Sequence, residues 1–285
     1  MLESDKIWLD GQLIDYKETK VHVLTHGLHY RTGIFEGIRC YPTKNGHAIF
    51  RIDDHIKRLY NSGKAYFMQF DFAPDELRNA TIDIVKVNKL GDCYIRIIAF
   101  YGYGKLGVNP LPNKVSIAIT AWKWTEHIRK EDLDQGIHLM VSSWEKVGSR
   151  SLPTHAKGVA NYANSALARM EALKSGFDEA IMLNSNGYVV EASAENIFLV
   201  KNGKLYTPPI SSGALEGITR DTVIDIAQKN NIKVIFENIS RDELYYFDEV
   251  FLTGTASEIV PVGYIDHRKI GNGGMGYITS LIRDH

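Results

Sequence analysis

The arrangement of hydrophobic and polar positions along the chain predicts a mixture of short strands and helices. Two long apolar runs, Cys93–Tyr101 and Val115–Trp122, are typical of buried strands. Near the start, Lys6–Asp15 is predicted to form a hairpin, because Asp10-Gly11 is a favourable two-residue turn.

Two helices are predicted in the first half of the chain. One begins at Asp53 or Asp54, either of which can cap it, and runs to about Phe67. The second begins at Pro74, which suits a first helical turn, and ends at Leu90. Further helices are predicted over 161–175, over 219–230 and after the capping box 240–243, with strands over 48–50, 137–143, 180–183, 188–192, 197–200, 232–236, 250–253 and 259–265.

The predicted fold class is α+β in two domains, because strands and helices mix without strict βαβ alternation. The stretch from Lys123 to Gln135 is highly charged and is predicted to be a solvated interdomain linker. It separates a small N-terminal domain (1–122) from a larger C-terminal domain (136–285) with mixed strands and helices.

Composition narrows the classes of function. A net charge of -1 and the absence of a strongly basic stretch argue against nucleic acid as a partner. No apolar run is long enough for a membrane span, and the acidic start of the chain does not fit a signal peptide. The two cysteines, Cys40 and Cys93, are far apart, so a cytoplasmic protein without a disulfide framework is expected.

Lys157 is the first candidate for chemistry. It lies in His155-Ala-Lys-Gly-Val-Ala-Asn161, surrounded by small and apolar residues rather than acids. Burial among such neighbours lowers the pKa of an amine and makes it a nucleophile for carbonyl groups. By itself the pattern fits an ordinary surface lysine better.

Glu191 is the second candidate, within the apolar strand Tyr188–Ser193. A buried carboxylate needs a cation or several donors, and no neighbour in the strand supplies one. A protonated ring nitrogen of a cofactor is one possible partner. A position on the solvent face of the strand is the competing interpretation.

Two segments can bind an anion. Gly217-Ile218-Thr219 precedes a predicted helix, whose first N–H groups favour negative charge. The loop Thr253–Ser257 offers a glycine and hydroxyl groups. Both patterns also occur in ordinary turns.

Three histidines, His22, His26 and His29, suggest a metal site only weakly. Gly27 interrupts a helix that would align them, and no carboxylate follows at ligand spacing, so no metal is expected.

Taken together and in order, several segments resemble the branched-chain amino-acid aminotransferases of the fold-type-IV class of pyridoxal-phosphate enzymes. The resemblance extends from about Ile7 to Arg283. Its strongest stretches are 26–30, 35–39, 94–96, 107–110, 152–157, 161–162, 186–191, 195–196, 207–209, 217–221 and 254–258. Each segment is a weak signal, but the collinear set is specific.

The resemblance implies a cofactor, pyridoxal 5'-phosphate (PLP), and a role for each matching residue. Lys157 is expected to bind the cofactor covalently and then to act as the base. Glu191 is expected to keep the pyridine nitrogen protonated, and Tyr162 to donate to the phenolate oxygen. The phosphate is assigned to Arg58, Thr255 and the segment Gly217, Ile218 and Thr219, and one ring face to Leu215.

The resemblance also implies how substrates bind. An apolar pocket is assigned to Tyr30, Phe35, Trp124 and Tyr162, and the α-carboxylate to Tyr94 with the turn Thr255-Ala256. Arg96 is assigned to the distal carboxylate of glutamate, the family's usual partner substrate. Leu106 and Val108 are expected to reach a neighbouring subunit, so a homodimer or homohexamer is predicted.

Three departures from the family concern the substrate range: Arg31 and Ala160 replace glycines, and the chain ends early, at His285. Within the same fold, a D-amino-acid or (R)-amine aminotransferase or an aminodeoxychorismate lyase is the alternative. A catalytically inactive binding protein is disfavoured, because Lys157 and Glu191 are both present.

Overall fold

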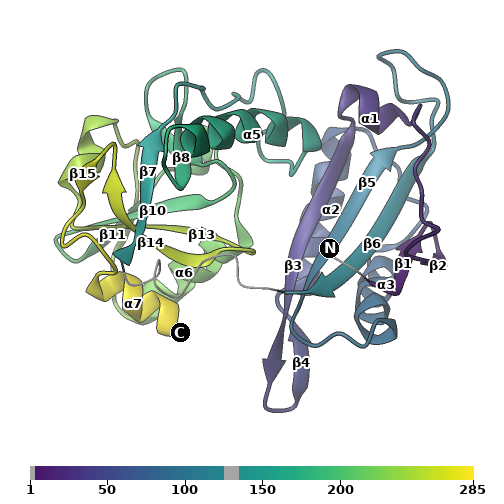
Figure 1. Ribbon diagram of the computed structural model, residues 1–285, viewed down its shortest axis with the longest axis horizontal. Coiled ribbons are helices and arrows are strands. Elements are labelled where there is room, and N and C mark those ends of the chain that lie inside the picture. The colour runs from purple at the N-terminus through teal and green to yellow at the C-terminus, as the bar shows by residue number, and fades with distance from the viewer. Residues whose placement is uncertain (1–3, 125–134) are drawn as a thin grey trace. The chain divides into compact units, whose positions relative to one another are not determined.

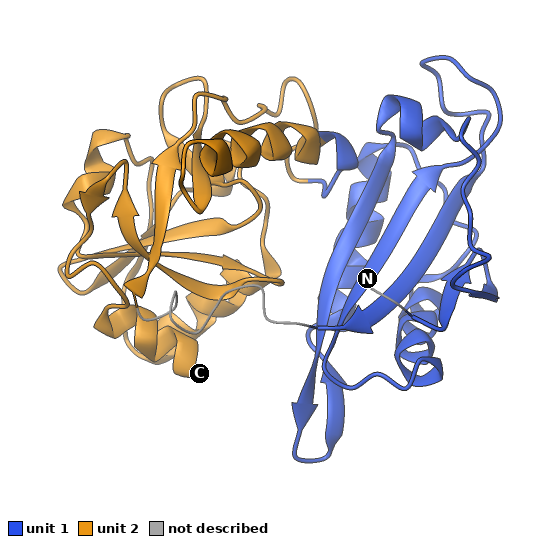
Figure 2. Ribbon diagram, in the orientation of Figure 1, with its two compact units in different colours: residues 1–125, 156–160 blue, residues 126–155, 161–285 orange. Residues whose placement is uncertain are grey.

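The computed structural model describes residues 4–124 and 135–285. The chain divides into two compact units (Figure 2): Met1–Thr125 with Ala156–Ala160, and Glu126–His155 with Asn161–His285. The predicted linker 123–135 lies mostly outside the described residues, so it stays a prediction. The segment Ala156–Ala160 belongs to the first unit, although it lies within the region 136–285 that was expected to form one domain.

The first unit is built on a six-stranded antiparallel sheet of order β2-β1-β6-β5-β3-β4 (Figure 1). Its elements are β1 (Lys6–Leu9), β2 (Gln12–Asp15), α1 (His26–Tyr30), β3 (Gly33–Thr43), β4 (Gly46–Ile49), α2 (Ile52–Ala65), α3 (Pro74–Val87), β5 (Cys93–Tyr101) and β6 (Val115–Lys123). The predicted hairpin and the two long apolar strands are confirmed. The strand β3, which pairs with β5 along eight residues, was not predicted.

Helices α2 and α3 cover one face of this sheet (Figure 1). Side chains alternate along β3, so Ile34 and Ile38 point to the covered face and pack with Ile56 and Leu59 of α2. Glu36 lies between them on the same alternating face and is fully buried. A charged residue therefore sits inside the core of the first unit, where it needs partners.

The predicted cap of α2 is wrong. Arg51, in the left-handed conformation, precedes the helix, and Asp53 and Asp54 lie in its first turn. Their carboxylates are favourable there because the N-terminal end of a helix carries partial positive charge. Helix α3 begins at Pro74 as predicted.

The second unit contains a nine-stranded mixed sheet of order β12-β11-β10-β13-β14-β7-β8-β9, with β15 paired to β14. Its elements are β7 (Ile137–Val141), α5 (Val159–Lys174), β8 (Glu179–Leu183), β9 (Val189–Ala192), β10 (Asn196–Lys201), β11 (Lys204–Thr207), η1 (Ile210–Ser212), α6 (Ile218–Lys229), β12 (Val234–Phe236), η2 (Asp242–Tyr246), β13 (Glu249–Gly254), β14 (Glu258–Ile265), β15 (Arg268–Lys269) and α7 (Tyr277–Asp284). The predicted capping box is confirmed only in part: the backbone N–H of Ser240 donates to Glu243 at 2.7 Å, but the Ser240 hydroxyl donates to the carboxylates of Asp242 and Glu243 and does not cap a backbone N–H.

Small residues let α5 approach the sheet closely. Ala168 and Ala172 pack on Ala180 and Met182 of β8. Helices α6 and α7 cover β10 and β13, where the rings of Phe198 and Phe251 are stacked (Figure 1). No helix among the described residues has the length and apolar character that crossing a membrane requires.

Candidate functional site

The backbone of Lys157 is anchored in the first unit. Its N–H donates to the hydroxyl of Ser62 at 3.0 Å, and its carbonyl accepts from the N–H of Phe35 at 3.0 Å. The side chain lies over the ring of Phe35, with Nζ 5.0 Å from the ring centroid. The segment 156–160 is thus attached beside β3, and it carries the candidate nucleophile to the aromatic ring.

Burial lowers the pKa of the Lys157 amine to about 8, and the charge of Arg58 acts in the same direction, while Glu36 and Tyr94 partly oppose the shift. At pH 7 an amine with this pKa is neutral in about one molecule in ten, against about one in three thousand for an ordinary lysine. The structure therefore supplies the nucleophilic form that the sequence pattern suggested.

A fully buried carboxylate, Glu36, fixes the side chain of Arg58. Nε and Nη2 of Arg58 donate to Oε1 and Oε2 of Glu36 at 2.7 and 2.8 Å, a bidentate pair. Burial raises the pKa of Glu36, but Arg58 and a 2.8 Å hydrogen bond with His55 more than offset it and hold that pKa at about 2. One edge of the Arg58 guanidinium is thus occupied by Glu36, which fixes the direction of the other edge.

His55 is neutral, since burial lowers its pKa. Its Nδ1–H donates to Glu36, and its Nε2 has no hydrogen-bond partner among the described residues.

Tyr94 and Arg96 lie side by side on the open face of the same sheet, as the alternation along β5 predicts. Nη2 of Arg96 donates to the Tyr94 hydroxyl at 3.1 Å, and its guanidinium lies 4.7 Å from the centroid of the Phe35 ring. Opposite them, a Cβ atom on Gly37 would meet the Tyr94 hydroxyl at 1.9 Å, so only glycine fits. Within the described residues Arg96 has no ion pair with a carboxylate.

Of the other residues predicted in the first unit, one packs against Tyr94 and three lie on the surface. Trp124 stacks on Tyr94 with ring centroids 5.2 Å apart. Tyr30, Leu106 and Val108 are exposed, and Val108 most of all, at 83%. The loop that carries Leu106 and Val108 is tied to α1, because Nε2–H of His26 donates to the carbonyl of Gly107 at 2.7 Å.

In the second unit, Glu191 is buried and both of its carboxylate oxygens have partners. Its Oε1 is 2.8 Å from the ammonium of Lys146, and its Oε2 accepts from Asn196 Nδ2 and from the N–H of Leu215, both at 3.0 Å. The interpretation of Glu191 as a buried carboxylate is therefore confirmed, and the solvent-face alternative is wrong. Its cation does not come from the strand, as the sequence indicated, but from Lys146, which reaches it from another part of the chain.

The start of α6 lies next to this carboxylate. Asn196 connects the two, since its Nδ2 also donates to the carbonyl of Leu215 at 3.0 Å and its Oδ1 lies where a Cβ on Gly217 would be. Gly217 precedes the helix, which begins at Ile218 and continues through Thr219. Tyr162 is half-buried in the first turn of α5. The structure thus assembles Glu191, Leu215 and the start of α6.

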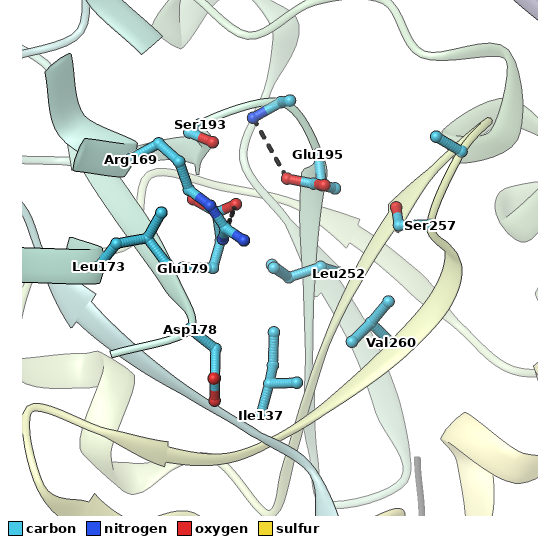
Figure 3. Close-up of a pocket in the computed structure, with 12 residues that line it drawn as sticks. Ile137, Arg169, Leu173, Asp178, Glu179, Ser193, Glu195, Leu252, Ser257 and Val260 are labelled. Atoms are coloured by element: carbon cyan, nitrogen blue, oxygen red, sulfur yellow. Dashed lines mark hydrogen bonds and ion pairs between the residues drawn. The ribbon is translucent and has the colours of Figure 1, made fainter. Parts of the chain in front are cut away.

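The turn between β13 and β14 carries Thr255 and Ala256. Ala256 borders a cavity of about 440 Å³ in the second unit (Figure 3). Arg169 and Glu179 form an ion pair there, and burial together with the charge of Glu179 raises the pKa of Glu195 to about 7. Neither Glu191 nor Tyr162 lines this cavity.

The remaining positions have local explanations. His26 engages neutral groups with both ring nitrogens, since Nδ1 accepts from the Thr32 hydroxyl at 2.8 Å. Among the described residues, no three metal-ligating side chains gather at one point.

Arg31 adopts a left-handed conformation (φ 58°) at the end of α1, which explains why glycine suits this position. Ala160 lies in the first turn of α5, where alanine is compatible.

Three residues that contact the candidate site were not predicted from the sequence: Glu36, His55 and Lys146. Glu36, in the middle of an apolar strand, and His55 with Arg58, three apart on one helix face, form a pattern that could have been recognised. Lys146 offers no such signal, because its distance along the chain from Glu191 follows no helical or strand repeat.

Comparison with known proteins gives consistent results. The amino-transferase class IV family model matches residues 33–265. The chain is 43% identical over 282 residues to the branched-chain-amino-acid aminotransferase of Salmonella typhimurium, covering 99% of this chain and 91% of that protein. The crystal structure of the Escherichia coli branched-chain amino acid aminotransferase is similar with a TM-score of 0.97 at 42% identity, covering 99% of this chain and 93% of that chain.

Two structures of the T.th. branched-chain amino acid aminotransferase show ligands. One is complexed with N-(5'-phosphopyridoxyl)-L-glutamate and the other with 4-methylvaleric acid. Each has a TM-score of 0.95 at 44% identity, covering 100% of this chain and 93% of that chain. The resemblance and the fold class predicted from the sequence are confirmed.

Proposed function

Because the chain belongs to the class IV aminotransferases, which are PLP-dependent transferases, we propose that it exchanges an amino group between branched-chain L-amino acids and 2-oxoglutarate. Leucine, isoleucine and valine would each react in one half of a ping-pong cycle, and glutamate would form in the other. One observation carries the substrate proposal. In the first unit a nucleophilic lysine, an aromatic ring and an arginine that has no carboxylate partner among the described residues lie together at Lys157, Phe35 and Arg96.

The residues present fit PLP. Lys157 has the lowered pKa that attachment to an aldehyde requires, and Glu191 is held as an oriented carboxylate by three donors. Arg58 and the N–H groups of Ile218 and Thr219, in the first turn of α6, are suited to a phosphate. We assign the phosphate to these groups together with Gly217 and Thr255, the ring face to Leu215, and the phenolate oxygen to Tyr162.

When bound, PLP supplies an electron-accepting ring that stabilises negative charge on the substrate α-carbon. The Nζ atom of Lys157 would hold the cofactor in the resting protein and, once released, would move the proton at that α-carbon. Glu191 would hold a proton at the ring nitrogen, which would maintain the electron demand of the ring. Arg58 would keep the phosphate in place while the substrate changes.

Substrate recognition is assigned to the residues that the family resemblance identified. Phe35, Tyr30, Trp124 and Tyr162 would enclose a branched side chain, and Tyr94 with Thr255-Ala256 would bind the α-carboxylate. Arg96 would pair with the distal carboxylate of glutamate or 2-oxoglutarate, and its present contacts are a tyrosine hydroxyl and an aromatic face.

Oligomer formation is part of the proposal. The exposed apolar side chains of Tyr30, Leu106 and Val108 lie at one edge of the first unit, where a second copy of the chain would cover them. We propose a homodimer, alone or within a homohexamer, in the cytoplasm.

A substrate panel tests the reaction class. The purified PLP-bound protein is incubated with L-amino acids, D-amino acids or primary amines, with 2-oxoglutarate as acceptor, and glutamate formation is measured. We expect the highest kcat/KM for L-leucine, L-isoleucine and L-valine. A preference for D-amino acids or for amines without a carboxylate would refute the proposal in favour of another class IV activity.

A further inference from the structure

A buried lysine, Lys146, pairs with the carboxylate that is proposed to contact the cofactor ring. Lys146 follows β7 and is only 9% exposed, and its own N–H donates to the carbonyl of Leu183 at 2.7 Å. Its Nζ lies 2.8 Å from Oε1 of Glu191, and both side chains are less than a tenth exposed. A lysine is rarely buried to this extent unless it is paired.

The other oxygen of Glu191 is also occupied. Oε2 accepts one hydrogen bond from Asn196 and one from the backbone of Leu215. The protein alone therefore supplies one positive charge and two further donors to this carboxylate. Glu191 is charge-balanced and fixed in direction without any contribution from a cofactor.

Resting on the proposed role of Glu191, we propose that Lys146 is its resident counter-ion and a positioning residue. In the cofactor-free protein Lys146 balances the charge of Glu191 and fixes its orientation. In the PLP-bound protein the carboxylate is shared between the ammonium of Lys146 and the protonated ring nitrogen. Lys146 thus has two effects: it makes the cofactor-free protein stable, and it moderates how strongly Glu191 attracts the proton on the ring.

The first experiment measures the pair without cofactor. Removing one partner of a buried ion pair leaves an unpaired charge, so the melting temperature of cofactor-free Lys146→Met should fall by roughly 5–10 °C. The double variant Lys146→Met with Glu191→Gln, which removes both charges, should recover most of this loss. Lys146→Arg, which keeps the charge, should stay near the wild type. A double variant no more stable than Lys146→Met alone would overturn the proposal.

If Lys146→Met fails to fold, Lys146→Gln replaces it in the same comparison of single and double variants, since an amide can still donate to Glu191 without carrying a charge. The double variant remains the decisive comparison.

The second experiment adds PLP at saturation. In Lys146→Met the ring cation takes the place of the missing ammonium, so PLP should raise the melting temperature by several degrees more than it does in the wild type. Equal gains in both proteins would mean that the ring does not meet this carboxylate. That result would overturn both the sharing of Glu191 between Lys146 and the ring nitrogen and the proposed role of Glu191. By contrast, a double variant that recovers no stability in the cofactor-free experiment would overturn only the role of Lys146.

A spectroscopic readout separates positioning from packing. With PLP labelled by ¹⁵N in the ring, the ring-nitrogen chemical shift is followed over pH, and the ring should keep its proton to higher pH in Lys146→Met, because Glu191 then serves a single cation. Lys146→Arg should lose the ring proton at the same pH as the wild type. Loss of the ring proton at the same pH in Lys146→Met as in the wild type would show that Lys146 is only structural and would overturn its positioning role.

Discussion

Replacing Glu36 by glutamine should lower the stability of the protein at neutral pH and change how stability depends on acid. The pKa of this fully buried carboxyl is held at about 2, against an ordinary value near 4.5, by Arg58 and His55 acting against burial. A difference of about 2.5 pH units corresponds to roughly 3 kcal/mol of folding free energy. Because the folded-state pKa is depressed, this contribution is complete above about pH 4.5 and is lost as the pH falls through about 2.

The free energy of unfolding, measured by denaturant titration at several pH values, tests this prediction. Glu36→Gln should be less stable than the wild type by about 3 kcal/mol at pH 7 and by roughly half as much at pH 3. Asp53→Asn is the matched control, because its exposed ion pair with Arg78 should contribute less than about 1 kcal/mol. A Glu36→Gln deficit of the same size at both pH values, or none at all, would show that the ion pair does not stabilise the fold as described.

Three further predictions concern the proposed site. Arg96→Leu should raise the barrier of the single-turnover reaction with glutamate or 2-oxoglutarate by about 2–4 kcal/mol but change the rate of the leucine reaction less than tenfold. Equal losses in both reactions would indicate a structural arginine. Glu191→Gln should still bind PLP, raise the barrier to transamination by about 2–4 kcal/mol and destabilise the cofactor-free protein, since Lys146 loses its partner. Unchanged kcat with weakened PLP binding would contradict this prediction. The rate at which PLP attaches to the cofactor-free protein should rise as the pH passes through about 8, where Lys157 loses its proton, and stopped-flow absorbance showing no dependence between pH 6.5 and 9 would argue against this lysine.

The elements that the sequence predicted well are those whose pattern agrees with their burial. The strands β5 and β6 are apolar runs whose central residues, such as Ile95, Ile97, Ile117 and Ile119, are fully buried. Helix α3 has its proline and its first-turn acids where the helix begins. In these elements the local preference and the tertiary packing favour the same structure.

Strand β3 was missed for a physical reason. It contains Glu36, Gly37 and Arg39, which are unfavourable in an ordinary buried strand. Gly37 makes room for Tyr94, and the two charges find partners on α2 and at Asp92. The residues that weaken the strand signal are those that the fold uses around the candidate site.

Contacts between residues that are far apart in the sequence also limited what could be predicted of the candidate site. The sequence offered a buried position for Glu191 as one of two interpretations, and it did not indicate the partner, because Lys146 reaches Glu191 through the fold of the second unit rather than through a spacing. The apolar neighbours of Lys157 indicated a nucleophile only weakly, and the family resemblance assigned it that role. Its lowered pKa depends on burial and on the charge of Arg58, both of which only the fold supplies.

The position of cofactor attachment is the most direct test of the proposed function. The PLP-bound protein is reduced with borohydride, digested and examined by mass spectrometry, and Lys157→Ala is treated in parallel. We expect the phosphopyridoxyl group on the peptide that contains Lys157, no modified lysine in the variant, and turnover of the variant below about a tenth of the wild type. Modification of another lysine, Lys146 above all, or substantial turnover by Lys157→Ala would contradict the assignment of Lys157 as the residue that carries the cofactor.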